Sequence, residues 1–497
     1  MSARPEPLGH PPSLLPAPLA AQRSDGPAGE VWLRVAPRDL DASARALREA
    51  GARYVTVLAD HDGQPGVVVV LALRGELVLL HSPSEEAKLD RHLHMSRWWP
   101  AARWAERELH ERHSLGAPAP AGGLTAPDPD RIVERVRGLD VFSIPYGPVR
   151  SGIFEAIQFD IQSGGENVPF IQTRPFFKHR GLEARCRGLT PERAAIVTER
   201  IAGIASCAYG TAFAQAVERA LDVPCPPRAA RWRVVHCELE RMACHLDVIA
   251  KQAETTALSV GQARFQILKE RVMGMRAALT GSRFGRGQIV PGGVRGEGTA
   301  TLDDLMAQLD ELDRQLGEDR RLFMRTASMT DRLIGSGRLS RGCVERHGGV
   351  GPVARGSGLS IDARHERPYG EYERLGLQVV THREGDAMAR VNVRFGELLE
   401  SMRILRQCVD HLRRRDGQLR AALPEAATGG AFGWVEAPQG ELCIWVFVRD
   451  GVVSRTHVAS PSLRNWAPFD HAFPRDVLTD FAFIEHSFGL TPAGADR

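Results

Sequence analysis

Two long runs of apolar residues with helical spacing constrain the fold of this chain more than any other feature. In each run the apolar side chains recur at alternating intervals of three and four residues, which places them on one face of an α-helix. The first run is Leu302, Leu305, Leu309, Leu312 and Leu316, and the second is Leu398, Met402, Leu405, Val409 and Leu412. A helix with one apolar stripe buries it against a neighbour, so this region is predicted to be a helical bundle.

Short apolar or alternating runs near both ends of the chain predict β-strands beside the bundle. Four of them lie close to the N-terminus, at 31–35, 54–58, 67–73 and 77–81. A helix-like run ends near Ala50, where Gly51 stops it. A β-rich stretch with a turn at 164–167 follows residue 140, and alternation returns at 433–450. The predicted fold class is α+β, with a small N-terminal α+β domain followed by a helical bundle with flanking small β-sheets.

Two segments of unusual composition divide the chain. Seven prolines fall within residues 1–29, and because proline lacks an N–H donor and restricts the backbone, this segment is predicted to be a disordered tail. The segment 117–130 opens with A-P-A-P-A-G-G, a composition that cannot bury a core, and is predicted to be a linker. The two domains are therefore expected at 30–116 and 131–497.

Composition excludes several classes of function. The chain has 64 basic and 61 acidic side chains, interspersed rather than gathered into the basic face of a nucleic-acid-binding protein. Its longest apolar stretch, 67–73, is far shorter than the roughly 20 residues of a membrane-spanning helix, and no leader pattern is found, so a cytoplasmic location without a membrane span is expected. The eight cysteines form no CxxC pair, so neither a disulfide framework nor a zinc or iron-sulfur site is predicted.

Short motifs in a fixed order carry a resemblance to a known family. The N-terminal domain ends on W-A-E-R-E-L at 104–109 and S-L-G at 114–116. The second domain contains I-P-Y-G-P-V at 144–149, H-R-G-L-E at 179–183, E-L-E-R at 238–241 with His245 after it, G-G-V-R at 292–295, V-G-P-V-A-R-G-S-G at 350–358, E-A-P at 436–438 and D-R at 496–497. Over residues 30–497 the chain resembles the large subunit of the nickel-iron hydrogenase and complex I superfamily, in particular the energy-converting (group 4) hydrogenases and formate hydrogenlyase.

The resemblance implies an architecture and a set of partners. Residues 30–116 correspond to a complex I C-type domain, similar to its 30 kDa subunit, and residues 131–497 correspond to a hydrogenase large subunit or complex I D-type domain. It implies an oxidoreductase complex in which an iron-sulfur small subunit and membrane subunits are the partners. The chain itself would lie on the cytoplasmic side, peripheral to the inner face of the cell membrane.

The cysteines that hold the metal in hydrogenases are missing. The resemblance implies two pairs, in R-I-C-G-x-C and D-P-C-x-x-C, because thiolates bind nickel and iron and two of them bridge the metals. The four corresponding positions are Ala202, Ala205, Thr491 and Gly494. Two further family positions are changed, a histidine to Tyr209 and an arginine to Gln439. The nickel-iron centre is therefore predicted to be absent, and Cys207, at the wrong spacing, is predicted to be a packed residue.

The resemblance to complex I also implies a possible quinone site, because complex I lacks the same cysteines and binds a quinone headgroup in the vacated space. Its quinone anchors are a histidine and a tyrosine, and here Phe154 and Gly203 stand at those positions. Tyr209 is predicted to supply a phenol from about one helical turn away. The candidate cavity is therefore assigned to Arg150, Phe154, His179, Arg180, Glu183, Ala202, Ala205, Tyr209, Gln439, Thr491 and Gly494. No metal ligand and no catalytic residue is assigned.

Three functions remain open at this level. In the first, the chain and an iron-sulfur small subunit enclose a cavity for a quinone or another small acceptor, with no cofactor bound by the chain directly. In the second, the chain is a non-catalytic scaffold that passes conformational strain or holds its partners together without binding a substrate. The arginine, histidine and glutamate side chains of the candidate set would then satisfy one another or a backbone carbonyl. The third, an active hydrogenase, is disfavoured because alanine and glycine side chains offer no donor atom.

Overall fold

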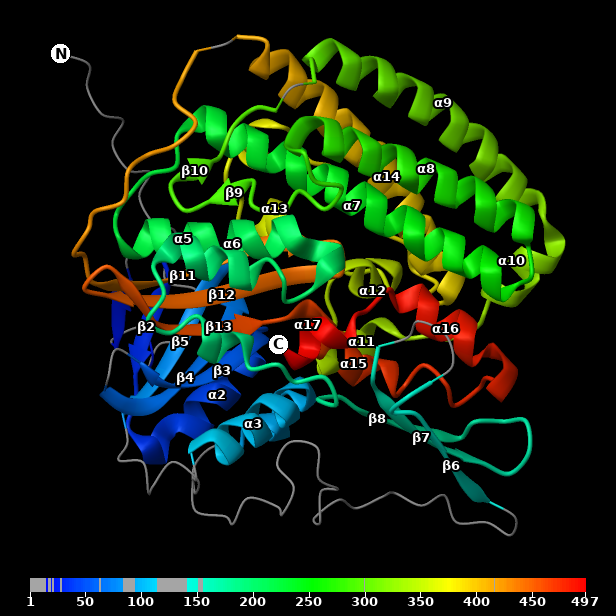
Figure 1. Cartoon of the computed structure of the whole chain (residues 1–497). Helices are drawn as coiled ribbons and strands as arrows, with labels where there is room; N and C mark the ends of the chain where they lie inside the picture. The colour runs from blue at the N-terminus through cyan, green and yellow to red at the C-terminus, as the bar shows by residue number, and fades with distance from the viewer. Residues whose placement is uncertain are drawn as a thin grey trace. The chain divides into compact units, whose positions relative to one another are not determined.

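The computed structural model describes residues 15–16, 19, 22–26, 29–61, 64–83, 94–113, 141–150, 155–298, 300–414 and 416–497. The chain divides into two compact units, Met1–Ala121 and Gly122–Arg497, whose elements Figure 1 shows in chain order from blue to red. The predicted linker, 117–130, lies outside the described residues, as does most of the predicted tail. The assignment of the first unit to a C-type domain stays a prediction.

The first unit is built on a five-stranded sheet with the strand order β1-β2-β5-β4-β3. The strands are β1 (Arg23–Asp25), β2 (Val31–Arg34), β3 (Arg53–His61), β4 (Gln64–Leu73) and β5 (Glu76–Pro83). Only the β2–β5 pair is parallel. The helices are η1 (Pro37–Asp39), α2 (Leu40–Glu49), η3 (Met95–Arg97), η4 (Pro100–Ala102) and α3 (Arg103–His113). The four predicted strands and the helix before Gly51 are confirmed, and Gly51 itself adopts a φ of 92°, which favours glycine.

One element of this sheet differs from the prediction. Residues 23–25, placed in the disordered tail, form β1 and pair antiparallel with β2. An added edge strand needs only backbone donors and acceptors, so the proline content of the preceding residues does not reveal it.

The motif at 104–109 lies on α3. Glu106 and Glu108 of this motif are buried, and Glu106 accepts a hydrogen bond from the backbone N–H of Ser96 at 3.1 Å.

In the described residues of the second unit the strands form three small antiparallel sheets. They are β6-β7-β8 (Phe142–Tyr146, Gln158–Ser163, Phe170–Arg174), β9-β10 (Ile289–Val290, Gly293–Val294) and β11-β12-β13 (Gly429–Ala437, Gly440–Arg449, Val452–Ala459). The predicted turn at 164–167 joins β7 to β8. β11 packs so closely on the helix that contains Ala212 that a Cβ atom at Gly433 would overlap the carbonyl group of Ala212.

Helices form the rest of the second unit. They are α4 (Leu182–Arg185), α5 (Pro191–Thr198), η6 (Gly203–Ala205), α6 (Ser206–Ala220), α7 (Pro227–Thr255), α8 (Ser259–Thr280), α9 (Leu302–Arg325), α10 (Ala327–Leu333), α11 (Arg341–His347), α12 (Gly351–Gly356), α13 (Ala363–Glu366), η7 (Tyr372–Arg374), α14 (Ala387–Leu412), α15 (Pro461–Phe469), η8 (Leu478–Asp480), α16 (Phe481–Phe488) and α17 (Pro492–Asp496).

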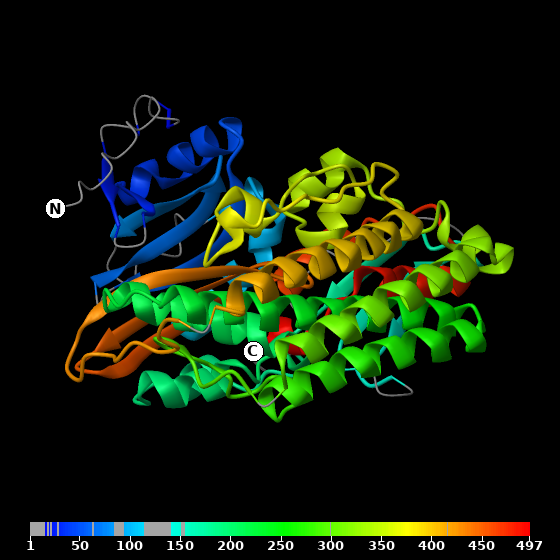
Figure 2. The same ribbon diagram turned by 90° about the horizontal axis from the view of Figure 1, so that it is seen from above.

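The four longest helices, α7, α8, α9 and α14, lie alongside one another in both views (Figures 1 and 2). α9 begins with a capping box between Thr301 and Asp304, which satisfies the free N–H groups of its first turn. Both predicted stripes face inward: Leu305, Leu309, Leu312 and Leu316 of α9 are buried, as are all five apolar residues of the second stripe on α14. The helical bundle is therefore confirmed. In the part of the chain that the structure describes, no helix combines the length and apolar character needed to cross a membrane.

Candidate functional site

The two segments that correspond to the hydrogenase cysteine motifs lie side by side. Arg180 joins them, because its Nη2 donates to the carbonyl oxygens of Ile201 at 2.6 Å and Ala493 at 3.1 Å. The backbone N–H of Arg180 also donates to the carbonyl of Arg497. The motif at 179–183 therefore connects the first and last segments of the predicted site through hydrogen bonds.

The other polar residues of this motif are bound within the protein. His179 Nδ1 lies 2.7 Å from the carbonyl oxygen of Asp496, to which it donates. Glu183 Oε1 accepts hydrogen bonds from the backbone of Val458 at 2.8 Å and from Arg497 Nη1 at 3.1 Å. These contacts match the alternative in which the candidate side chains are satisfied within the protein, here by backbone groups and by Arg497.

The positions of the missing cysteines are closely packed. Ala202 and Ala205 are buried at the start of the segment that leads into α6. Thr491 Oγ1 donates to Glu155 Oε2 at 2.7 Å, and the same carboxylate oxygen accepts the backbone N–H of Ala493 at 2.8 Å. The carboxylate of Glu155 therefore holds the start of α17 in place.

Tyr209 fills the space beside Gly494. A Cβ atom at Gly494 would lie 3.1 Å from the Tyr209 hydroxyl oxygen, which donates to Ser460 Oγ at 3.3 Å. Burial raises the pKa of Tyr209 to about 12, so the phenol is neutral at physiological pH. Phe154, the other aromatic residue of the candidate set, lies outside the described residues.

Gln439 stands where the resemblance predicts an arginine. Its Nε2 donates to Cys244 Sγ at 3.4 Å, and its backbone carbonyl accepts a hydrogen bond from Asn465 at 3.0 Å. Burial raises the pKa of Cys244 to about 12, so this thiol is protonated. The pair is neutral and joins the β11–β12 turn to α7.

A cavity of about 250 Å³ borders both former cysteine segments. Ile204 from the first segment and Thr491 from the last lie on its wall. The other residues that line it are Arg150, Glu155, Cys244, Asp247, Val248, Lys251, Trp466, Glu485, His486, Gly489, Leu490 and Pro492. Of the predicted set, Arg150 and Thr491 border this cavity, whereas Tyr209, His179 and Gln439 do not.

The charged side chains on the cavity wall are paired. Arg150 forms two hydrogen bonds with Glu485, at 2.8 and 2.9 Å. Lys251 contacts Asp247 at 2.9 Å. The pKa of His486 falls to about 4 because burial lowers it and the nearby charges of Lys251 and Arg150 add to that effect, while Asp247 acts in the opposite direction. His486 is therefore neutral at physiological pH, beside a wall of ion pairs.

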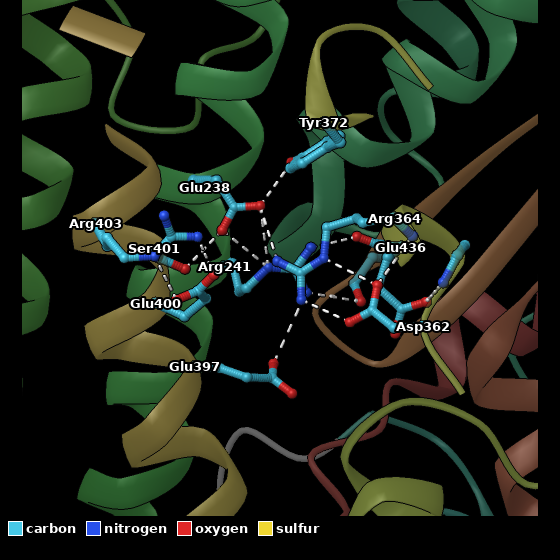
Figure 3. A network of polar contacts seen from close by, with 12 residues as sticks. Glu238, Arg241, Asp362, Arg364, Tyr372, Glu397, Glu400, Ser401, Arg403 and Glu436 are labelled. Carbon is cyan, nitrogen blue, oxygen red and sulfur yellow. Dashed lines mark hydrogen bonds and ion pairs between the residues drawn. The ribbon is translucent and has the colours of Figure 1, made fainter. Parts of the chain in front are cut away.

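A second cluster, the buried charge network, lies between α7, α14 and β11 (Figure 3). Its members are fully or almost fully buried: Glu238, Arg241, His245, Arg355, Asp362, Arg364, Glu397 and Glu436. Arg355 contacts three carboxylates, those of Glu397 at 2.7 Å, Glu436 at 2.8 Å and Asp362 at 3.2 Å. Figure 3 shows carboxylates and guanidinium groups from several elements converging on one centre.

Three family motifs meet in the buried charge network. Glu238 accepts hydrogen bonds from Arg364 at 3.0 Å, Tyr372 at 2.6 Å and Ser401 at 2.6 Å. His245 Nε2 lies 2.7 Å from Glu397, and burial lowers the pKa of His245 to about 4 despite that carboxylate. The network thus connects the motifs at 238–241, 350–358 and 436–438.

Comparisons with known proteins find similar sequences among hydrogenases and NADH dehydrogenases. The family model described as the respiratory-chain NADH dehydrogenase 49 Kd subunit matches residues 257–428. The carbon monoxide-induced hydrogenase of Rhodospirillum rubrum is 28% identical over 354 residues, which cover 70% of this chain and 97% of that protein. Formate hydrogenlyase subunit 5 of Escherichia coli strain K12 is 27% identical, with 71% of this chain and 63% of that protein covered. The mitochondrial NADH-ubiquinone oxidoreductase 49 kDa subunit of Neurospora crassa is 25% identical, with 78% and 87% covered.

The fold has a solved counterpart. A chain of the membrane-bound sulfane sulfur reductase, an archaeal respiratory membrane complex, superimposes with a TM-score of 0.68 at 24% identity, covering 72% of this chain and 99% of that chain. This chain is similar in sequence to hydrogenases and to the 49 kDa subunit of respiratory NADH dehydrogenases. The motif-based recognition is therefore confirmed.

The residues at the positions where the resemblance places the metal ligands do not fit a nickel-iron centre. Ala202, Ala205 and Gly494 have no donor atom, and the Thr491 hydroxyl is already bound to Glu155. A cysteine at Gly494 would also press on the Tyr209 hydroxyl. Among the described residues, no three histidine, cysteine, aspartate or glutamate side chains are grouped so that they could hold a metal ion.

Sequence reasoning missed most of the cavity wall. Asp247 and Lys251 on α7, together with Glu485 and His486 on α16, belong to no motif and carry no periodic signal. Cys207, by contrast, is buried as predicted, at the start of α6. Its N–H and that of the next residue donate to Glu240 at 2.8 and 2.9 Å, so a motif carboxylate caps this helix.

Proposed function

We propose that this chain is the large subunit of a complex I-like or energy-converting-hydrogenase-related membrane oxidoreductase, and that it works without a nickel-iron centre. In this proposal the cavity between the former cysteine segments receives a small electron acceptor. The observation that carries the proposal is that Ile204 and Thr491, from the two segments that hold the metal in hydrogenases, border one cavity without a thiolate in either segment.

The relatives indicate two kinds of acceptor. Their names include NADH-quinone oxidoreductases and a sulfane sulfur reductase. A quinone would find neither family anchor here, since Phe154 and Gly203 stand at those positions, and Tyr209 would have to exchange its contact with Ser460 for the quinone. A quinone is therefore one candidate within a broader class of small acceptors.

Two exposed apolar residues, one of them on the cavity wall, support a partner subunit. Ile204 and Phe284 are each 39% exposed, and Arg286 stacks on Phe284 while its guanidinium reaches to within 3.6 Å of a Cβ atom placed on Gly203. Exposed apolar residues next to a cavity are typical of docking surfaces. The proposed occupant is an iron-sulfur small subunit that delivers electrons. Membrane subunits would complete the complex, with this chain on the cytoplasmic side of the membrane.

The scaffold function remains the second candidate. It is favoured by the internal contacts of His179, Arg180 and Glu183, which leave these side chains bound to the protein itself. In that case the chain would hold its partners together and the cavity would contain only water. A volume of about 250 Å³ can hold several water molecules, each needing about 30 Å³.

The purified complex is expected to contain far less than one nickel per large subunit. The reason is the absence of thiolates at Ala202, Ala205, Thr491 and Gly494, and metal analysis after nickel-replete expression measures it. A nickel-containing hydrogenase produced in the same host serves as the control. One nickel per chain would refute this part of the proposal.

A cavity-filling variant separates the acceptor site from the scaffold. Val248→Phe places a larger side chain on the cavity wall, so it is expected to reduce acceptor turnover of the assembled complex at least tenfold. If the acceptor forms a hydrogen bond with the phenol, Tyr209→Phe should slow turnover by the factor that corresponds to about 0.5–1.5 kcal/mol, the free energy of one such bond. If the acceptor does not reach the phenol, turnover should be unchanged. Quinone reduction and melting temperature are measured for both variants. If Val248→Phe leaves acceptor reduction unchanged in an intact complex, the acceptor cavity is refuted and the scaffold function is the one supported.

A further inference from the structure

Three arginines beside the first former cysteine segment are exposed at the surface. Arg200 opens that segment, and Arg286 and Arg295 lie on either side of the short strands β9 and β10. Within the residues that the structure describes, none of the three side chains forms an ion pair with a carboxylate. Three exposed cations therefore stand at one end of the segment that holds the metal in hydrogenases.

The three arginines surround one buried carboxylate, that of Glu199, and so form a single basic patch. Glu199 accepts the backbone N–H of Gly287 at 2.7 Å, and a Cβ atom at Gly287 would lie 3.6 Å from Arg295 Nη1. A Cβ atom at Gly203 would lie 3.6 Å from Arg286 Nη2. Burial raises the pKa of Glu199, and the charges of all three arginines act against that rise, which places each of them near this carboxylate.

The basic patch carries a positive surplus. Glu199 can offset only one of its three charges, and it is 5% exposed, so it offers little to a partner. Two other glutamates of this region are bound to arginines outside the patch, Glu270 to Arg283 and Glu297 to Arg228. Each of these ion pairs is neutral as a whole, so the surplus remains at the surface.

The apolar neighbours of the basic patch favour a protein as its partner. Ile204 and Phe284 are exposed beside it, and Arg286 stacks on the ring of Phe284 at 5.0 Å. Arginine and aromatic residues are enriched in protein–protein interfaces, where lysine is depleted, and the patch contains arginine alone. A nucleic acid would need a longer row of basic groups along its backbone, and the whole chain has a formal charge of only +3.

We propose that the basic patch, with Ile204 and Phe284 at its edge, docks onto an acidic surface of the iron-sulfur subunit. This inference rests on the proposed function and specifies the chemistry of the partner's face: carboxylates opposite Arg200, Arg286 and Arg295. Complementary charges speed association and fix the orientation of the two proteins. Because Ile204 also borders the cavity, docking here brings the electron donor next to the acceptor site.

The first test cross-links the assembled complex with a carbodiimide, which joins a lysine amine to a carboxylate only where the two are in contact. In the Arg286→Lys variant, mass spectrometry is expected to find position 286 joined to an aspartate or glutamate of the iron-sulfur subunit. Arg321→Lys is the matched control, because Arg321 is an exposed arginine of α9 that also forms no ion pair among the described residues. It should give no cross-link to that subunit.

The second test measures the affinity of the chain for the iron-sulfur subunit. Arg200→Met/Arg286→Met keeps Arg295 beside Glu199 and is expected to weaken binding at least about tenfold at low ionic strength. High salt should reduce this difference, because it screens exposed charges. Arg321→Met/Arg325→Met, two exposed positions on α9, should weaken binding less than about twofold. The melting temperature of each variant shows that it is folded.

The outcomes separate this inference from the proposed function. No cross-link from position 286, in a complex that contains the iron-sulfur subunit and reduces the acceptor, would overturn the acidic docking surface and keep the proposed function. Equal weakening by the two double variants would overturn the assignment to the basic patch. Binding of phosphatidylglycerol vesicles that only Arg200→Met/Arg286→Met abolishes, without a cross-link, would make the partner a membrane surface. A purified complex without an iron-sulfur subunit would overturn both proposals.

Discussion

Replacing Arg355 by methionine is expected to lower the free energy of unfolding by about 3–5 kcal/mol. The guanidinium of Arg355 is fully buried and contacts Glu397 at 2.7 Å, Glu436 at 2.8 Å and Asp362 at 3.2 Å. Methionine fills a similar volume but leaves three carboxylates close together with less positive charge around them. The effect is measured by denaturant unfolding of the large subunit in its complex.

An exposed arginine gives the matched control. Arg314 contacts Glu311 and Glu318 at 2.7 Å on the exposed surface of α9, where solvent screens the ion pairs, so Arg314→Met should lower the free energy of unfolding much less than Arg355→Met. The double variant Arg355→Met/Glu436→Gln should recover part of the loss, because it removes one of the stranded carboxylates. Equal costs for the two single variants would show that the buried charge network does not stabilise the fold.

Acid is expected to destabilise the native protein more than the Glu238→Gln variant. Burial acts to raise the pKa of Glu238, but Arg241 and Arg364 outweigh it, and the pKa falls from its ordinary value of 4.5 to about 2. A carboxylate with a depressed folded-state pKa contributes stability above its unfolded pKa and loses it as the pH falls through the folded pKa. The full contribution is about 3 kcal/mol, of which about 2 kcal/mol should be lost between pH 7 and pH 3.

The difference between native protein and variant isolates this effect. Other groups act in the opposite direction: burial raises the pKa values of Asp476 and Asp496 to about 6, so their contributions to stability grow as the pH falls through 6. These groups are unchanged in Glu238→Gln and cancel in the comparison. The stability gap should therefore narrow on acidification from pH 7 to pH 3. A gap that stays constant over this range would contradict the depressed pKa of Glu238.

Local patterns were sufficient for much of the fold. The stripes at 302–316 and 398–412 became the buried faces of α9 and α14, because a period near 3.6 can be buried only as a helix. Gly51 ends α2 and adopts a positive φ, as its place after a helix-like run predicted. The order of the short motifs was enough to recognise the similarity to known proteins, because a motif is recognised from its own residues and does not depend on contacts with distant parts of the chain.

The cavity could not be predicted in the same way. Its wall combines side chains from α7, α16 and the two former cysteine segments, and no spacing in the sequence reports that these elements meet. Tyr209 was predicted to face the cavity because it lies near the first segment. In the structure its hydroxyl turns to Ser460 beside Gly494, which depends on how α6 packs against the start of α17.

The sequence by itself therefore determined the helices, most strands, the homology and the loss of sulfur at four positions, because each is a property of residue identity or of local periodicity. Only the tertiary structure decided which charges are paired. Arg355 has three carboxylate partners from separate segments, whereas Arg394, on the same bundle, has none in ion-pair range among the described residues. The pairing of a buried charge depends on distances set by helix packing, and at low dielectric those distances decide whether the charge stabilises the fold.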